Sequence, residues 1–325
     1  MPGDLVFVTG ATGFIGSHVA RALGAEGYRI RALVRRPGAH VPDAEVVTGD
    51  LESAGALAAA MRGCRFLVHC AALYSFAPRE RRLMARVNVS GTAGLLEAAR
   101  VAGVERAVVT SSGSTVGPAR RGVAATENDY AAASGTSAYH HSKLEQERAA
   151  VAARVPVVLV LPTTPVGPGD WKPTPTGRVV LDFARGRIPA RPSGGGLNLV
   201  DVEDVAWAHV AALQRGTPRE RYLVGGENVS FDRFWELLSE VTGRPAPALR
   251  LPHAVALTAG TLDELRCLVI PASRPVVPLE GVRMSREQMY VDCTKAQREL
   301  AYRPRPVRDA LAGAVAWYRT NGYLN

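Results

Sequence analysis

Short apolar runs alternate with helical patterns over the first half of the chain. Runs such as Leu5–Val8 and Val157–Leu161 are almost wholly apolar, which is typical of strands buried on both faces. Alternating buried strands and helices predict an α/β fold with a Rossmann-type, doubly wound parallel sheet. The predicted strands are Leu5–Val8, Tyr28–Val34, Glu45–Val47, Arg65–His69, Ala107–Thr110 and Val157–Leu161, and the predicted helices between them are Phe14–Leu23, Ala54–Met61, Arg79–Val101 and Thr136–Ala153.

The pattern changes after residue 162. Segments 161–177 and 191–200 are rich in Pro, Gly and Thr or Ser and are predicted to be mainly loop. We expect one domain from residues 1–162 with parts of 198–225, and a smaller, irregular C-terminal substrate-binding domain mainly from 163–197 and 226–325. The helices predicted in this second half are Val202–Gln214, Phe231–Thr242 and Val307–Tyr318.

Composition narrows the class of protein. With 47% hydrophobic and 21% charged residues, the 325-residue chain is typical of a soluble, cytoplasmic protein, and its longest apolar run is far below the ~20 residues of a membrane span. The net charge of +9 comes from scattered arginines, so we expect no nucleic-acid role. No cysteine forms a CxxC pair or a Cys/His cluster, which predicts reduced thiols and no metal site.

A glycine-rich segment, Gly10-Ala-Thr-Gly13-Phe-Ile-Gly16, follows the first predicted strand and begins a helix. Glycines allow a tight turn and close approach to a pyrophosphate, and the helix offers free N–H groups. The first domain is therefore predicted to bind a dinucleotide. The residues expected to contact it in this loop are Gly10, Thr12, Gly13, Phe14, Ile15 and Gly16.

The end of the second predicted strand bears on which dinucleotide binds. An NAD site usually has an acidic residue there, whereas this chain has Arg35 and Arg36. Arginine can bind a ribose 2′-phosphate through paired charge-assisted hydrogen bonds. The sequence therefore favours NADP(H), with NAD(H) as the alternative.

Tyr139 and Lys143 lie four residues apart on a predicted helix, and this spacing places them on one face. A nearby ammonium lowers a tyrosine pKa, so Tyr139 could serve as general acid or base toward a substrate oxygen. Lys143 could also bind the nicotinamide ribose. Ser112, or alternatively Ser111, ends the fifth predicted strand, where its hydroxyl could orient a carbonyl.

Together with Asp50-Leu51, His69–Ala72 and Asn88–Thr92, these motifs resemble the extended short-chain dehydrogenases/reductases, also called the NAD-dependent epimerase/dehydratase family. The resemblance covers essentially the whole chain. Segments such as WKPTPTGRVV, LNLVDVEDVA and the C-terminal RELAYRPRPVRDALAGAVAWYRTNGYL resemble the hopanoid-associated sugar epimerase and dihydroflavonol 4-reductase-like subfamilies.

The resemblance implies further site residues. Asp50 and Leu51 would flank the adenine, Ala71 and Ala72 would line the cofactor, and Pro162 would contact it. Asn88 would support the active site from its helix. The substrate residues expected on this basis are Tyr74, Asn88, Ser114, Thr164 and Trp171, with Phe76 as a further stacking candidate.

Three functions remain open on the sequence. An NADPH-dependent carbonyl reductase is favoured, because NADPH is the cell's reducing carrier. An NAD-dependent nucleotide-sugar epimerase is the alternative, and Lys172, Arg178, Arg187 and Arg191 are available for its nucleotide. A non-catalytic NADP(H)-binding sensor is the third. A homodimer through helices 79–101 and 136–153 is expected, and the apolar stretch 251–268 could pack in the second domain, dock a partner or touch a membrane.

Overall fold

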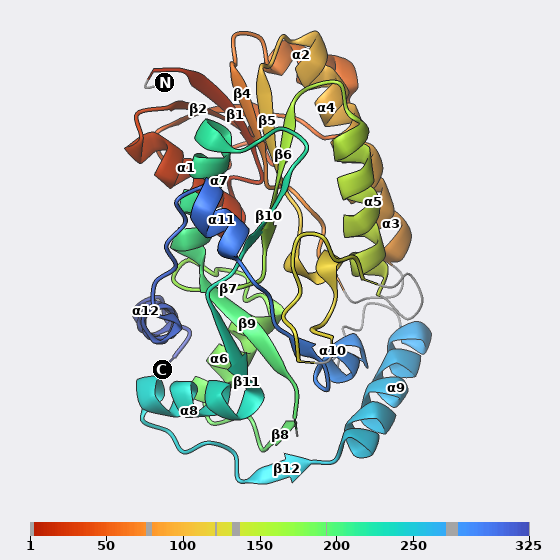
Figure 1. Cartoon of the computed structure of the whole chain (residues 1–325), viewed down its shortest axis with the longest axis vertical. Helices are drawn as coiled ribbons and strands as arrows, with labels where there is room; N and C mark the ends of the chain where they lie inside the picture. Colours follow the sequence, from red (N-terminus) through yellow and green to blue (C-terminus); the bar gives the residue numbers. More distant parts are fainter. Residues whose placement is uncertain are drawn as a thin grey trace.

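The computed structural model describes residues 3–75, 80–120, 122–131, 137–192, 194–270 and 279–324. Its centre is a seven-stranded parallel sheet with the order β10-β6-β5-β4-β1-β2-β3 (Figure 1). The chain leaves β1 in one direction and returns to the other side of it with β4, so the predicted doubly wound sheet is confirmed. Its strands are β1 (Leu5–Thr9), β2 (Arg29–Val34), β3 (Ala44–Thr48), β4 (Phe66–His69), β5 (Arg106–Thr110), β6 (Val157–Pro162) and β10 (Arg221–Val224).

Alternating side chains of the central strands supply two separate cores. In β1, Val6 and Val8 point to one face and Phe7 points to the other, and all three are fully buried. Helices cover both faces, which explains why the central strands are continuously apolar (Figure 1). One face carries α1 (Phe14–Ala25), α7 (Val202–Arg215) and α11 (Thr294–Glu299), and the other carries α2 (Ala54–Ala60), α4 (Gly91–Val101) and α5 (Ala138–Ala152).

The helix predicted over residues 79–101 is divided in the structure. It consists of α3 (Arg81–Ala85), a π-helical turn (Arg86–Ser90) and α4. Such π turns occur mainly as single turns inside α-helices, often at functional sites. This one contains Asn88, whose amide contacts the backbone that follows β4.

The two segments predicted to be mainly loop contain strands, so that prediction is wrong in part. Strand β7 (Thr164–Val166) pairs with β9 (Gly196–Asp201), which also pairs with β11 (Glu227–Ser230) and β13 (Gln288–Met289). The glycine that begins β9 is required by packing, because a Cβ on Gly196 would lie 2.4 Å from the Tyr290 hydroxyl. Glycine therefore marks close approach here rather than a turn.

A third core lies beyond the carboxyl edge of the large sheet. It is enclosed by α6 (Pro175–Ala184), α8 (Phe231–Thr242), α12 (Val307–Thr320) and β9. Side chains cap the first two of these helices: Thr174 accepts from the Gly177 N–H and Ser230 from the Arg233 N–H. The remaining elements are β8 (Ala190–Pro192), β12 (Leu249–Leu251), α9 (His253–Val269), α10 (Leu279–Met284) and a 3-10 turn, Gly113–Val116.

Candidate active site

The glycine-rich loop joins β1 to α1 and leaves no room for a side chain at Gly10 or Gly16. Gly10 has φ +76°, and a Cβ on it would lie 2.6 Å from the Ala71 backbone nitrogen. A Cβ on Gly16 would lie 2.1 Å from the Gly10 carbonyl oxygen. The helix that follows begins after Gly13, which offers no side-chain cap, so its first N–H groups can face an anion. The loop therefore fits a dinucleotide pyrophosphate.

The other predicted cofactor residues follow the ends of parallel strands, which places them along the same edge of the sheet as the loop. Arg35 and Arg36 come directly after β2, and both are exposed. The carboxylate of Asp50, after β3, accepts a 2.9 Å hydrogen bond from the Glu52 N–H. Leu51 follows it, Ala71 and Ala72 follow β4, and Pro162 ends β6.

The predicted proton donor Tyr139 lies on the first turn of α5, and its side chain lies near Ser112, which acts to lower the tyrosine pKa. Ser112 follows β5, and its Oγ lies 2.9 Å from the Ser114 Oγ. The Tyr74 ring meets Tyr139 edge-on, with 4.3 Å between centroids. The structure thus brings Ser112 and Tyr74 to the Tyr139 side chain, with Ser114 hydrogen-bonded to Ser112.

The charge environment of Tyr139 differs from the expectation. Burial raises the pKa of Tyr139 to about 12, and its hydrogen bond with Ser112 acts in the opposite direction. The Lys143 ammonium is 1% exposed and donates to the Thr110 carbonyl at 2.8 Å and to the Gln146 Oε1 at 2.5 Å. Burial lowers the pKa of Lys143 to about 8, with Glu147 acting in the opposite direction. Tyr139 is therefore held in its protonated form at neutral pH.

Ser111, the alternative to Ser112, has a different partner. Its hydroxyl donates to Glu147, which also accepts from the Thr115 hydroxyl at 2.7 Å. Glu147 forms a buried ion pair with Arg221 at 2.9 Å. Sequence reasoning missed this cluster, although the position of Glu147, one helical turn beyond Lys143, was an available signal.

Asn88 is fully buried and fixes the chain that follows β4. Its Oδ1 accepts from the Leu73 N–H at 2.8 Å, and its Nδ2 donates to the Leu73 carbonyl at 2.9 Å. The same Nδ2 donates to the Ser142 hydroxyl at 3.1 Å, on the helix that carries Tyr139. Asn88 therefore positions the segment that carries Tyr74 rather than offering its own amide to a substrate.

Two other predicted substrate residues lie in the second half of the chain. Thr164 is half-buried in β7, opposite Leu199 of β9. The Trp171 ring packs edge-on against Trp317 of α12, with 4.7 Å between centroids, and its carbonyl accepts from the Tyr323 hydroxyl at 2.7 Å. Trp171 thus contacts Trp317 and Tyr323, both near the C-terminus. Phe76 lies outside the described residues.

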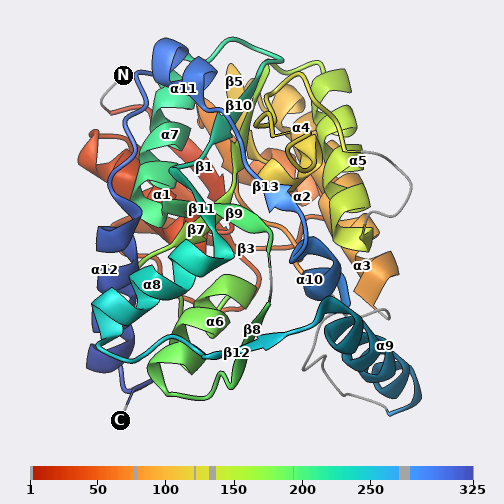
Figure 2. The same cartoon turned by 60° about the horizontal axis from the view of Figure 1, so that its bottom comes forward.

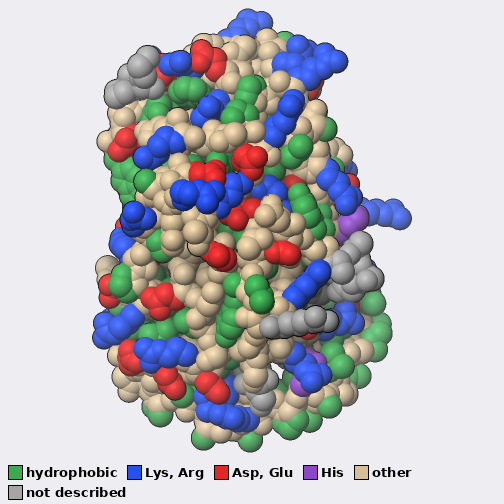
Figure 3. All heavy atoms as spheres, viewed as in Figure 1, with side chains coloured by type: hydrophobic (Ala, Val, Ile, Leu, Met, Phe, Trp, Pro, Cys, Tyr) green, Lys and Arg blue, Asp and Glu red, His purple; other side chains and the backbone are tan. Residues whose placement is uncertain are grey.

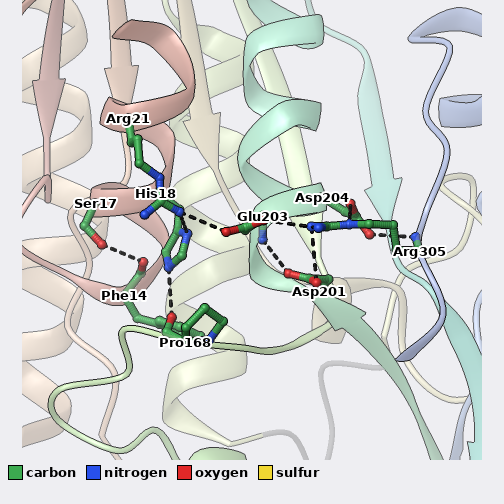
Figure 4. Close-up of polar contacts among 9 residues, drawn as sticks. All are labelled: Phe14, Ser17, His18, Arg21, Pro168, Asp201, Glu203, Asp204 and Arg305. Carbon is green, nitrogen blue, oxygen red and sulfur yellow. Dashed lines mark hydrogen bonds and ion pairs between the residues drawn. The ribbon is translucent and has the colours of Figure 1, made fainter. Parts of the chain in front are cut away.

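A cluster of polar side chains links α1, the helix that follows the glycine loop, to the second half of the chain (Figure 4). His18 of α1 donates through Nε2 to the Pro168 carbonyl at 2.9 Å and accepts at Nδ1 from Arg21 at 2.7 Å. Arg21 also pairs with Glu203, which pairs with Arg305. These contacts fix the loop after β7 to the helix that follows the glycine loop. Arg305 pairs as well with Asp201 and Asp204, and the Asp201 side chain caps α7 by accepting from the Glu203 N–H.

Other sequence features have structural roles. His69 lies between the Thr9 and Thr92 hydroxyls at 2.7 and 2.8 Å, which gives it a structural role. The four cysteines are free thiols. In the described part of the chain, no three His, Cys, Asp or Glu side chains gather in a way that could hold a metal ion.

Fold and site together define a dinucleotide-dependent oxidoreductase of the extended short-chain dehydrogenase/reductase class. A family model described as "NAD dependent epimerase/dehydratase family" matches residues 6–225. The chain belongs to this family.

The relatives of this chain carry the names of different activities. The chain is 41% identical to a Synechocystis protein provisionally named dihydroflavonol 4-reductase, over 99% of this chain and 96% of that one. It is 34% identical to sterol demethylase protein B of Methylococcus capsulatus, over 98% and 99%. A solved nucleoside-diphosphate-sugar epimerase from Pseudomonas aeruginosa is 26% identical and covers 99% of both chains, with a TM-score of 0.82.

Proposed function

We propose that this enzyme is an NADPH-dependent carbonyl reductase that interconverts a ketone and a secondary alcohol. The observation that carries the proposal is the protonated Tyr139 hydroxyl, which lies near Ser112 and Tyr74 at the sheet edge where the glycine loop lies. Reduction of a carbonyl needs a proton donor, and a tyrosine whose pKa is about 12 remains a donor at neutral pH.

In this mechanism, residues of the chain bind the cofactor, orient the carbonyl group and donate the proton. The glycine loop binds the pyrophosphate through backbone N–H groups, with Ala71 and Pro162 beside the cofactor. The nicotinamide, when bound, supplies the hydride. Ser112 orients the carbonyl oxygen, and Tyr139 donates its proton to that oxygen as the alcohol forms. Lys143 is a cation below pH 8 and stabilises the phenolate left behind.

The preference for NADPH rests on Arg35 and Arg36. Both are exposed directly after β2, where a carboxylate would repel a 2′-phosphate. Neither forms an ion pair with an acidic residue among those the structure describes, so both guanidinium groups are available to a phosphate. Arg31, earlier on the same strand, is by contrast paired with Glu45 at 2.9 Å.

The substrate proposed is a flat, mainly apolar carbonyl compound. The Tyr74 ring is 44% exposed and adjoins Tyr139, so it offers an aromatic surface beside the proton donor. The names of two relatives, a dihydroflavonol reductase and a sterol demethylase protein, also refer to fused-ring compounds. We further propose a cytoplasmic homodimer through α4 and α5, for which a monomer by size-exclusion chromatography is the contrary result.

A nucleotide-sugar epimerase remains the second candidate, because an epimerase shares the whole fold at a TM-score of 0.82. Of the basic residues considered for its nucleotide, Arg191 is paired with Asp232 at 2.8 Å, whereas Lys172 is exposed. Such an epimerase would retain its NAD through each reaction cycle. A cofactor sensor would bind dinucleotide without turnover.

The first experiment is to denature purified protein, identify any released dinucleotide, and titrate the emptied protein with NADPH and NADH in parallel. We expect little retained cofactor and at least tenfold tighter NADPH binding, which corresponds to ~1.4 kcal/mol. Arg35→Ala should remove most of that preference, while the exposed Arg62→Ala, placed after α2, serves as the matched control. Tightly retained NAD would instead favour the epimerase.

A further inference from the structure

Helix α9 presents its apolar side to solvent and its charged side to the protein. Leu262 is 63% exposed, whereas the Asp263 side chain next to it is only 10% exposed. Val255, Leu265 and Val269 lie 7 residues before and 3 and 7 residues after Leu262, so they share its face. All three are more than half exposed. This orientation is the reverse of an ordinary surface helix.

Two threonines on the same side do not make it polar. The Thr258 hydroxyl donates to the Ala254 carbonyl at 2.9 Å, and the Thr261 hydroxyl donates to the Leu257 carbonyl at 2.8 Å. Both hydroxyls are therefore satisfied by the helix's own backbone. With the exposed Leu268 and Ile270 at the C-terminal end, the face forms one continuous apolar strip, here called the α9 strip.

The strip is held firmly in this orientation. On the inner side, Gly260 packs against α10, where a Cβ would lie 3.1 Å from the Leu279 Cα. Glu264 pairs with Arg81 of α3 at 3.5 Å, which links the inner side of α9 to a second helix. Figure 2 shows α9 beside α10 at one corner of the molecule, and hydrophobic side chains line that corner in Figure 3.

We propose that the α9 strip adsorbs to the surface of an anionic lipid bilayer, with the helix lying in the interface. Charge complementarity selects this occupant. Arg82 of α3, Arg283 of α10 and Arg286 are exposed on the elements that adjoin α9, and none has an acidic partner among the described residues. Exposed apolar residues flanked by unpaired arginines are the features that bind a helix to anionic headgroups.

Two other ways of covering the α9 strip fit the charge and length of this protein's segments less well. A second copy seated on the strip would bring the exposed, unpaired arginines beside both strips to one interface. Crossing the bilayer is also excluded for the described segments, because none of their helices has the length and apolar content of a membrane span. The α9 strip is therefore inferred to lie on the membrane, which is independent of the reaction that the site performs.

The test is flotation of the purified full chain with vesicles of phosphatidylcholine alone or of equal parts phosphatidylcholine and phosphatidylglycerol. We expect the wild type to bind the anionic vesicles and to dissociate in high salt. Leu262→Glu/Leu265→Glu should weaken this binding at least tenfold. The matched control is Val46→Glu/Val123→Glu, which adds the same charge at two exposed valines elsewhere and should bind like the wild type.

Circular dichroism and dinucleotide binding verify that each variant is folded, and Val269→Glu, near the helix end, replaces the double variant if that one does not fold. Wild type that ignores both kinds of vesicle overturns the proposal. Equal loss of binding in the control pair also overturns it, because added charge alone would then explain the effect. A dimer that only the α9 variants dissociate, seen by chromatography, overturns it in favour of a second copy.

Discussion

The Lys143 ammonium donates a 2.5 Å hydrogen bond to Gln146, three residues further along α5. Because an ammonium can only donate, the amide atom facing it is Oε1, and Nε2 must face the other way. There it donates to the Thr92 hydroxyl at 2.9 Å. Gln146 is fully buried, so its orientation is fixed by these two contacts.

The donor and acceptor assignments extend from Gln146 to His69. The Thr92 hydroxyl donates to the Asn88 carbonyl at 2.7 Å, so it can only accept from His69. His69 therefore carries its proton on Nε2 and accepts at Nδ1 from the Thr9 hydroxyl at 2.7 Å. A continuous series of hydrogen bonds thus runs from Lys143 to the end of β1.

The substitution Gln146→Leu tests this series of hydrogen bonds. The substitution leaves Lys143 with one fewer acceptor in a buried site, so we expect the free energy of unfolding to fall by about 1–3 kcal/mol. The alkaline limb of the activity–pH profile should move to lower pH, because the ammonium loses a partner. Urea denaturation and the pH profile are the measurements. Gln214→Leu, at an exposed glutamine of α7, should change neither.

Tyr139→Phe removes the proposed proton donor and keeps the ring that packs against Tyr74. We expect the loss of turnover by 10²-fold or more with little change in NADPH affinity, since general acid catalysis contributes about that much. Steady-state kinetics and fluorescence titration of the dinucleotide separate the two effects. Activity within a few fold of the wild type would remove Tyr139 from the mechanism.

The buried pair of Glu147 and Arg221 predicts a large stability effect. Arg221→Met leaves the carboxylate buried without its ion-pair partner, so we expect a loss of about 3–5 kcal/mol in unfolding free energy. Arg100→Ala removes an exposed arginine paired with Glu97 on α4 and should cost at most about 0.5 kcal/mol. Equal losses in the two variants, measured by urea denaturation, would contradict the prediction.

Buried histidines predict acid sensitivity. Burial lowers the pKa of His69 to about 3 and the pKa values of His140 and His209 to about 4. The unfolded chain then binds more protons between pH 6.5 and 4, so stability falls as the pH falls through this window. Each histidine contributes a slope of up to about 1.4 kcal/mol per pH unit.

Urea midpoints at pH 7, 6 and 5 measure that slope. His209→Gln should reduce it, and His40→Gln, at an exposed position, should leave it unchanged. A midpoint that stays constant from pH 7 to 5 would show that the folded protein takes up these protons without cost.

The sequence by itself determined the six strands of the first half and the turn that joins β1 to α1. Apolar runs, glycine spacing and the interval from Tyr139 to Lys143 are local properties, and local chemistry decides them. The helices α7, α8 and α12 were predicted within two residues for the same reason.

Tertiary structure decided what depends on distant partners. Strand β9 forms because β7, β11 and β13 pair with it, although its own sequence begins with glycines. Ser111 donates to Glu147 while Ser112 meets Tyr139, because successive residues after a strand point in different directions. The outward face of α9 was equally hidden, since an amphipathic pattern shows that a helix has an apolar side but not which side the neighbouring chain covers.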